Sequence, residues 1–303
     1  MADRRPLKLA LLQHACGDDP AENFARVCDM CREAAGRGAE LIVTQELFGS
    51  RYFCDREDPA NFDLAEPIPG PTTRRLSGLA AELGVAINAS LFERRAVGLY
   101  HNTSVLIGAD GALRGRYRKM HVPDDPSYLE KFYFTPGDRG FGSLTLSDDK
   151  TSPRVGPLVC WDQWFPEAAR LTAMAGAEVL LYPTAIGWHA DDSPEDHKNQ
   201  DDAWRTVMRG HAIANGVFVA AANRVGVEGV NTFWGGSFVA DPMGVVIAEA
   251  GSDGPEVLIA ELDLSAIERH RRTWSLFFRD RRPDAYGGLT RTWGDGFGDL
   301  AES

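Results

Sequence analysis

The chain has 303 residues and a formal net charge of −12 at pH 7, because 44 Asp and Glu outnumber 32 Lys and Arg. Hydrophobic residues make up 44% and charged residues 25%, a globular balance that excludes disordered, collagen-like and coiled-coil classes. The acidic balance argues against nucleic acid as the main partner, since phosphate binding requires a basic surface, and it permits a cationic ligand.

Nine short apolar runs predict strands, and most of them are apolar on both faces, as in sheets that are covered on both sides. In chain order they span residues 7–13, 40–46, 85–93, 103–111, 154–161, 177–185, 216–226, 235–244 and 256–264. Four amphipathic stretches that end at or beside a glycine predict helices at residues 20–36, 71–84, 165–176 and 201–215.

Turn signals at residues 109–111 and 241–244 join neighbouring strands as hairpins, so hairpins mix with strand–helix–strand units. This mixture predicts an α/β fold with a mixed sheet or two packed sheets and helices outside. The length alone suggests two domains of about 150 residues each. No low-complexity linker or charge run divides the chain, so we expect one domain over residues 1–273.

The last segment, residues 274–303, is aromatic and rich in Arg and Gly, with weak periodicity. We expect this C-terminal extension to pack on a partner subunit, because aromatic side chains such as Trp274 and Trp293 would otherwise be poorly hidden. The alternative is a frayed tail.

Several patterns bear on compartment and cofactors. The start of the chain has no secretory signal, no run reaches about 18 apolar residues, and the five cysteines are sparse and odd in number, so we expect a cytoplasmic protein and no membrane span. Without secretion, the glycosylation sequons at Asn88 and Asn102 are chance matches. Cys28 and Cys31 form a C-x-x-C without a second pair, which favours buried helix cysteines over a metal site. No dinucleotide, P-loop, serine-elbow or H-E-x-x-H motif occurs, so we expect no cofactor and no catalytic metal.

Three reactive side chains stand at or near the ends of predicted strands: Glu46, Lys119 and Cys160. Residues at the carboxyl ends of strands commonly line the sites of α/β proteins. Cys160 also precedes a predicted helix, where a thiolate is favoured. Each residue has a plainer interpretation, since Glu46 could cap a helix or pair with an arginine, Lys119 could coat a strand, and Cys160 could be a small buried hydrophobe. Spacing alone does not bring the three together.

Longer runs around these residues decide between the interpretations. The segments TQELF, RKMHVPDDPSYLEKFYFTPGD, CWDQWFPEAARL and YPTAIGW together resemble the nitrilase superfamily of carbon–nitrogen hydrolases, whose Glu–Lys–Cys triad has this chain order. The resemblance covers nearly the whole chain, and within the superfamily these runs are most similar to the N-carbamoylputrescine amidases. It implies a single-domain, four-layer α-β-β-α sandwich, a homo-oligomer without a cofactor, and hydrolysis of N-carbamoylputrescine to putrescine, ammonia and carbon dioxide in polyamine biosynthesis.

The resemblance also implies roles for individual residues. Cys160 would attack the carbonyl carbon and form a thioester, and Glu46 would take the thiol proton. Lys119 and the backbone N–H of Trp161 would stabilise the oxyanion. Glu130 stands where related carbamoyl hydrolases carry a second catalytic glutamate, and its plainer interpretation is an ion pair with Lys131 or Lys119.

A cationic ureido substrate would need aromatic walls and a distal carboxylate. The aromatic candidates are Tyr52, Trp161, Trp164 and Trp188, and the carboxylate candidates are Asp125, Asp162, Asp191 and Asp192. The plainer interpretation of Asp191 and Asp192 is that they are solvated loop charges. His121 is a candidate for orienting a carboxylate or the substrate. The nearest alternative is the same chemistry on an N-carbamoyl amino acid or β-ureidopropionate, for which Arg170, Arg205 or Arg209 would bind the substrate carboxylate. A nitrilase and an inactive polyamine-binding or assembly protein are further alternatives.

Overall fold

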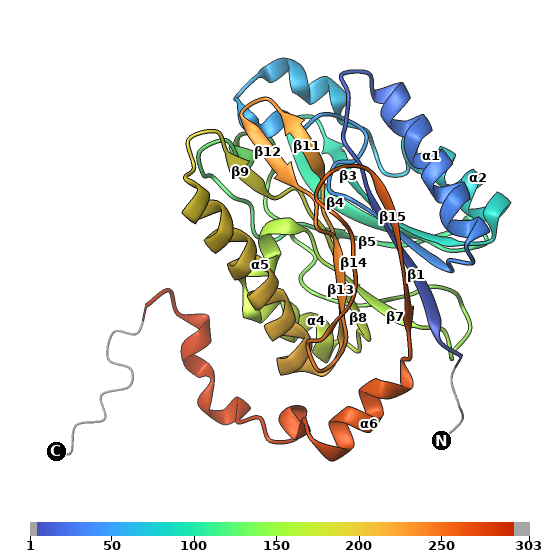
Figure 1. Ribbon diagram of the computed structural model, residues 1–303, viewed down its shortest axis with the longest axis vertical. Coiled ribbons are helices and arrows are strands. Elements are labelled where there is room, and N and C mark those ends of the chain that lie inside the picture. The colour runs from blue at the N-terminus through green and yellow to red at the C-terminus, as the bar shows by residue number, and fades with distance from the viewer. Residues whose placement is uncertain (1–4, 294–303) are drawn as a thin grey trace.

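The computed structural model describes residues 5–293. Two six-stranded sheets pack face to face, and helices cover both outer faces, which gives the expected four-layer α-β-β-α sandwich in one domain (Figure 1). Mixed strand pairings and helices on the outside follow from the combination of strand–helix–strand units with hairpins that the sequence predicts.

The first sheet contains the first and the last strand of the chain as neighbours. Its strand order is β15 (Glu256–Leu262), β1 (Leu7–Gln13), β2 (Leu41–Thr44), β3 (Ala86–Ala96), β4 (Leu99–Ile107) and β5 (Leu113–Arg118). The pairs β1–β2 and β2–β3 are parallel, and the other pairs are antiparallel. Helices α1 (Pro20–Gly36) and α2 (Pro71–Leu83) cover its outer face.

The second sheet has the order β14 (Val246–Glu249), β13 (Phe238–Ala240), β10 (Phe218–Ala222), β8 (Val179–Pro183), β7 (Arg154–Pro157) and β6 (Leu144–Thr145). Its outer face is covered by α4 (Pro166–Met174) and α5 (Pro194–Asn215). A small third sheet joins β11 (Val225–Glu228), β12 (Asn231–Trp234) and β9 (Gly187–His189). Two further helices are α3 (Glu130–Tyr133) and α6 (Ser265–Thr273).

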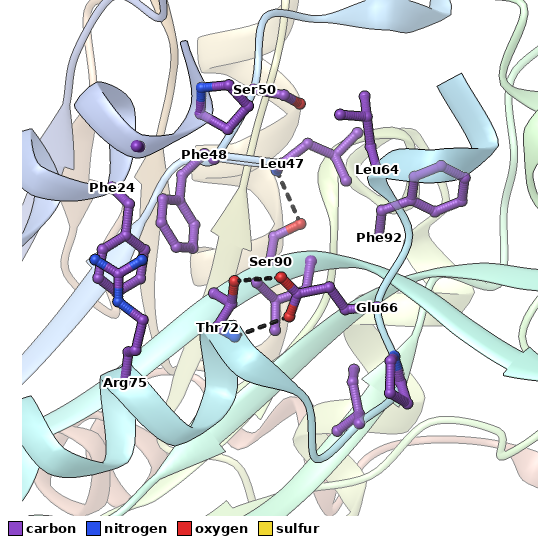
Figure 2. A pocket seen from close by; sticks show the side chains of 16 residues that line it. Phe24, Leu47, Phe48, Ser50, Leu64, Glu66, Thr72, Arg75, Ser90 and Phe92 are labelled. Atoms are coloured by element: carbon purple, nitrogen blue, oxygen red, sulfur yellow. Dashed lines mark hydrogen bonds between the residues drawn. The ribbon is translucent and has the colours of Figure 1, made fainter. Parts of the chain in front are cut away.

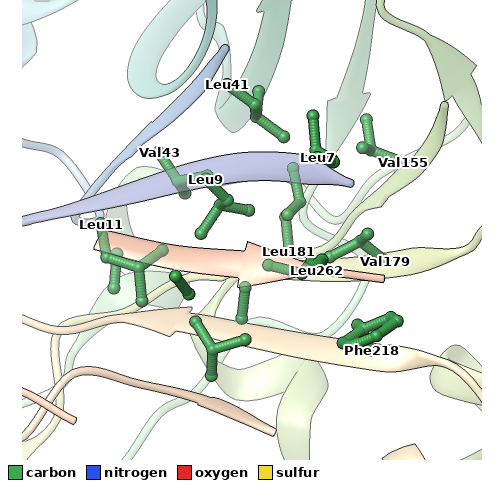
Figure 3. Close-up of a cluster of buried hydrophobic side chains, with 14 of the residues drawn as sticks. Leu7, Leu9, Leu11, Leu41, Val43, Val155, Val179, Leu181, Phe218 and Leu262 are labelled. Atoms are coloured by element: carbon green, nitrogen blue, oxygen red, sulfur yellow. The ribbon is translucent and has the colours of Figure 1, made fainter. Parts of the chain in front are cut away.

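The alternation of side chains along each strand explains why the strands are apolar on both faces. Leu9 and Leu11 of β1 belong to the cluster between the sheets, where Leu181 of β8 also lies (Figure 3). Ala10 and Leu12 of the same strand point the other way, into the cluster beneath α1 and α2. Since successive residues face opposite layers, a strand with two covered faces needs an unbroken apolar run.

All nine predicted strands and both hairpins are present, with shifted ends, and some elements escaped the sequence analysis. Helix α5 begins at Pro194 rather than at residue 201, because Ser193 forms a capping box with Asp196 ahead of the apolar repeat. The short strands β9, β11 and β12 were missed. The prediction of a strand through Cys160 was wrong at its end, because β7 stops at Pro157 and Cys160 starts a 3₁₀ turn, Cys160–Trp164.

The five cysteines are all buried or half-buried. Cys31 is buried on α1, as expected, whereas Cys28 of the same helix is only half-buried, and all five cysteines are free thiols. Within residues 5–293 there is no group of side chains that could hold a metal ion and no helix long and apolar enough to span a bilayer.

After α6 the chain runs along the outside of α4 and α5 (Figure 1), where Trp274 and Trp293 are 58% and 79% exposed. Residues 294–303 of the expected extension lie outside the described part.

Candidate functional site

The nucleophile candidate stands on a tight turn between β7 and α4. Cys160 is the first residue of this turn and has a φ of 39°, in the left-handed region that residues other than glycine rarely adopt. Asp162, two residues on, accepts hydrogen bonds from the Val159 N–H at 3.0 Å and from the Tyr117 hydroxyl at 2.8 Å. These bonds tie the turn to the neighbouring sheet, so they hold Cys160 in its uncommon conformation.

His121 also contacts Asp162 and so helps to hold the turn. Its backbone N–H and its Nδ1 lie 3.1 and 2.8 Å from Oδ1 of Asp162. The imidazole ring stacks on Phe165 with a centroid separation of 3.7 Å. Asp162 and His121 therefore bind each other beneath the turn.

A lysine between two glutamates forms the centre of the site. Lys119 follows β5, Glu46 follows β2, and Glu130 begins α3. The Nζ of Lys119 donates to Oε1 of Glu46 at 2.8 Å and to Oε2 of Glu130 at 2.6 Å. All three side chains are buried. The structure therefore joins residues that come from three separate elements, and of the two partners considered for Glu130 the observed one is Lys119.

Burial and these charges shift the ionisation of the site. Burial raises the pKa of the Cys160 thiol well above its usual range, and the nearby Glu46 raises it further, while Lys119 lowers it. Burial also raises the pKa of Glu130 to about 7, against the opposing influence of Lys119. The two carboxylates hold the pKa of Lys119 well above its usual value despite the burial of the ammonium group. At neutral pH the site thus contains a protonated thiol and a charged lysine.

A second buried cation braces the chain on the other side of Glu46, and sequence reasoning missed it. Arg224 donates to the backbone carbonyls of Glu46 at 2.9 Å and Leu47 at 2.8 Å, and it forms a two-bond ion pair with Glu228. Leu47 has a φ of 49°, so Arg224 stabilises a strained turn at the glutamate. The only signal was a lone arginine at the end of an otherwise apolar run, VFVAAANR.

A cavity of about 660 Å³ opens beside Cys160. Its walls include Trp161, Trp164, Tyr128 and Trp234, and three of the expected carboxylates, Asp125, Asp191 and Asp192, also line it. None of the described residues that line this cavity is a lysine or an arginine. The cavity therefore combines aromatic surface with negative charge.

Three of the predicted substrate-binding residues, Tyr52, His121 and Trp188, do not line this cavity. Tyr52 is buried, and its hydroxyl donates to Oε1 of Glu130 at 2.8 Å. Trp188 stacks on His197 and packs against Trp234, and its Nε1 donates to the His197 carbonyl. The carboxyl group of Glu130 is thus held by a tyrosine on one oxygen and by Lys119 on the other.

Comparisons by family model, by sequence and by structure agree on one protein family. The model of the carbon-nitrogen hydrolase family matches residues 8–272. An N-carbamoylputrescine amidase of Arabidopsis thaliana is 45% identical over 292 residues, which cover 93% of this chain and 95% of that protein. A citrullinase of Francisella tularensis is 42% identical over 292 residues, covering 95% and 99%. The crystal structure of a carbon-nitrogen hydrolase from Helicobacter pylori G27 superposes with a TM-score of 0.91 at 45% identity, covering 95% of this chain and 99% of that one.

The raised pKa of the Cys160 thiol yields a testable prediction. Glu46→Gln removes a negative charge that disfavours the thiolate, so the pH midpoint for alkylation of Cys160 by iodoacetamide should fall relative to the wild type. Mass spectrometry of the digested protein measures this midpoint for each cysteine. Cys31, buried on α1, serves as the internal control and should react alike in both proteins. An unchanged Cys160 midpoint would show that Glu46 does not act on the thiol.

Proposed function

The chain belongs to the carbon–nitrogen hydrolase family, and we propose that it hydrolyses N-carbamoylputrescine to putrescine, ammonia and carbon dioxide through a thioester on Cys160. The names of the plant relatives support this substrate. The observation that carries the proposal is the cavity beside Cys160, with its aromatic walls and three carboxylates. Such a cavity suits an apolar four-carbon spacer that ends in an ammonium group.

The first chemical step forms the thioester. Glu46 takes the proton from the Cys160 thiol, which needs a base because its pKa is raised by burial. The sulfur then bonds to the ureido carbon, and the carbonyl electrons move onto oxygen. When the tetrahedral intermediate collapses, a C–N bond breaks and the departing nitrogen takes the proton from Glu46. Either ureido nitrogen fits this scheme.

Stabilisation of the oxyanion falls to Lys119 and to the backbone N–H of Trp161. The ammonium of Lys119 is fixed by two carboxylates and needs no reorganisation when negative charge develops. Removing one such donor typically costs about 3 kcal/mol or more of transition-state stabilisation. Glu130 keeps Lys119 in place and has an oxygen positioned by Tyr52, so it can also bind a substrate N–H.

The second step regenerates the thiol. Glu46 deprotonates a water molecule, which attacks the thioester carbon, and the C–S bond breaks as the sulfur regains a proton. The carbamate product then decomposes to carbon dioxide and the remaining nitrogen compound, which is putrescine if ammonia left first and ammonia if putrescine left first. The same glutamate thus serves both steps, first beside the sulfur and then beside water.

The charge of the cavity separates this function from its nearest alternatives. An N-carbamoyl amino acid or β-ureidopropionate would bring a carboxylate towards Asp125, Asp191 and Asp192. The arginines considered for binding it are engaged elsewhere: Arg170 with the Ala214 carbonyl, Arg205 with Asp201 and Glu249, and Arg209 with the Gly244 carbonyl. Like charges repel, so a cationic substrate is favoured.

We also propose that the protein is a cytoplasmic homo-oligomer. The five free thiols suit a reducing compartment. The C-terminal segment leaves Trp274, Leu289 and Trp293 exposed along the outside of α4 and α5, where Leu171 and Met174 are also exposed. Apolar surface of this kind is commonly covered by another subunit, so we place the contact with a second copy there.

The substrate proposal is tested with three ureido compounds. N-carbamoylputrescine and citrulline differ by one carboxylate on the carbon that carries the ammonium, so kcat/KM should favour N-carbamoylputrescine by about 100-fold or more, and N-carbamoyl-β-alanine should be poorer still. Ammonia release measures the rates, and Cys160→Ala should abolish them, whereas Cys31→Ala should not. Preference for a carboxylate substrate, or no ammonia from any ureide, would contradict the proposal. Turnover of a nitrile alone would identify a nitrilase.

The pH dependence tests the role of Glu130. The hydroxyl of Tyr52 donates to its carboxylate and lowers its pKa, which stands at about 7. If the ionised form holds Lys119, activity should rise with pH through about 7, and Tyr52→Phe should move this acid limb to higher pH. The loss of kcat/KM should be larger at pH 6.5 than at pH 8.5. Tyr133→Phe, in the same aromatic cluster, is the control that should leave the limb in place.

Light scattering tests the proposed subunit contact. The wild type should have the molar mass of two or more chains. The double variant Trp274→Ser, Leu289→Ser should shift the mass distribution towards the single chain, because it removes exposed apolar surface. Val97→Ser, which is fully exposed on the β3–β4 hairpin, is the matched control and should change nothing. A wild type with the mass of one chain would contradict the contact.

A further inference from the structure

Glu46 is held by a closed ring of hydrogen bonds that the proposed chemistry does not yet explain. Asn102 of β4 donates from Nδ2 to Oε1 of Glu46 at 2.7 Å. Ser90 of β3 donates to Oδ1 of Asn102 at 3.1 Å and accepts the backbone N–H of Leu47 at 3.1 Å. Since Leu47 follows Glu46, the ring returns to its starting point and ties the side chain and the backbone of the glutamate together. Figure 2 shows the bond between Ser90 and Leu47.

We propose that Asn102, oriented by Ser90, is the positioning residue that selects which oxygen of Glu46 moves protons. Oε1 accepts two hydrogen bonds, from Asn102 and from Lys119. Oε2 is buried, and no donor within residues 5–293 reaches it. A buried carboxylate oxygen without a partner is costly and calls for an explanation. In this structure the Cys160 thiol faces the Ala185 carbonyl at 3.8 Å, and Oε2 is the oxygen of Glu46 that is free to take its proton. The inference rests on the proposed role of Glu46 as base.

The ring also fixes the direction of the Asn102 amide. An amide can turn over and present its oxygen instead of its nitrogen. The Glu46 carboxylate only accepts, so it takes Nδ2 of Asn102, and Oδ1 then faces the Ser90 hydroxyl, which donates to it. The backbone carbonyl of Asn102 meanwhile accepts the Lys119 N–H at 2.9 Å. One residue thus places the base through its side chain and Lys119 through its backbone, and a side-chain substitution leaves the second contact intact.

The same strands contain a matched pair without a link to the site. Ser104 of β4 donates to Oδ1 of Asn88 of β3 at 3.0 Å, and both are fully buried. The two sequon-like patterns, Asn88-Ala-Ser90 and Asn102-Thr-Ser104, therefore interlock across the hairpin as two serine–asparagine pairs. Only the pair of Ser90 and Asn102 reaches Glu46, so Ser104→Ala controls for the loss of a buried serine hydroxyl.

Three variants test the proposal: Asn102→Leu, Ser90→Ala and Ser104→Ala. Asn102→Leu should lower kcat about 100-fold with KM within about three-fold, as expected when a catalytic group loses its alignment. Ser90→Ala should lower kcat about three- to ten-fold, the equivalent of one hydrogen bond. Ser104→Ala should match the wild type.

Two outcomes would overturn the proposal: losses in Asn102→Leu and Ser90→Ala no larger than in Ser104→Ala, or losses confined to KM. Thermal melting identifies any variant that fails to fold, and if Asn102→Leu does, Ser90→Ala against Ser104→Ala decides alone.

A readout without turnover separates this inference from the proposed function. With Glu46 released, its influence on the Cys160 thiol weakens, so the alkylation midpoint of Cys160 should fall in Asn102→Leu and Ser90→Ala but not in Ser104→Ala. A wild type that cleaves no ureide would end the proposed function while this comparison still decides the role of Asn102. Equal midpoints in all the proteins would overturn that role.

Discussion

A buried ammonium group between two buried carboxylates is the interaction on which the rest of the site depends. The side chain of Lys119 is buried, and so are the two carboxylates beside it, Glu46 and Glu130. Removing one partner from a buried ion pair typically costs about 3–5 kcal/mol, because an uncompensated charge remains. The three groups therefore have to be placed together, and the loops that carry them are fixed by further polar contacts.

Those contacts explain the unusual backbone around the site. Leu47 and Cys160 both have positive φ values, and each lies beside a buried polar group that donates to or accepts from the surrounding backbone. Arg224 bonds the carbonyls at Glu46 and Leu47, and Asp162 bonds the N–H before Cys160. Strain of this kind persists only where the surrounding structure holds it. Here it occurs at the thiol residue itself and at the residue that follows the Glu46 carboxylate.

The sandwich supplies the rigid frame for this arrangement. Strands β2 and β5 belong to the first sheet and β7 to the second, so Cys160 lies near Glu46 and Lys119 only because the sheets pack face to face. Packing between the sheets depends on side chains such as Leu9 and Leu181, which are fully buried. A close-packed interior resists small displacements, which protects distances of 2.6 to 2.8 Å around Lys119.

The sequence by itself determined the layers and the reactive residue types. Apolar runs such as residues 7–13 predicted strands with two covered faces because a strand repeats every two residues, and this local rule holds wherever the strand lies. The long run CWDQWFPEAARL placed Cys160 in its family by resemblance. Apolar periodicity did not place the helix start at Pro194, because that start is set by a capping box of Ser193 and Asp196, a different local signal.

Only the tertiary structure decided which residues meet. It paired Glu130 with Lys119, turned Asp162 and His121 towards each other beneath the turn, and left Asp125, Asp191 and Asp192 on the cavity wall. It also revealed Arg224 and Asn102, whose partners lie 178 and 56 residues away. Contacts over such separations depend on sheet order and register rather than on neighbouring residues, so no local pattern contains them.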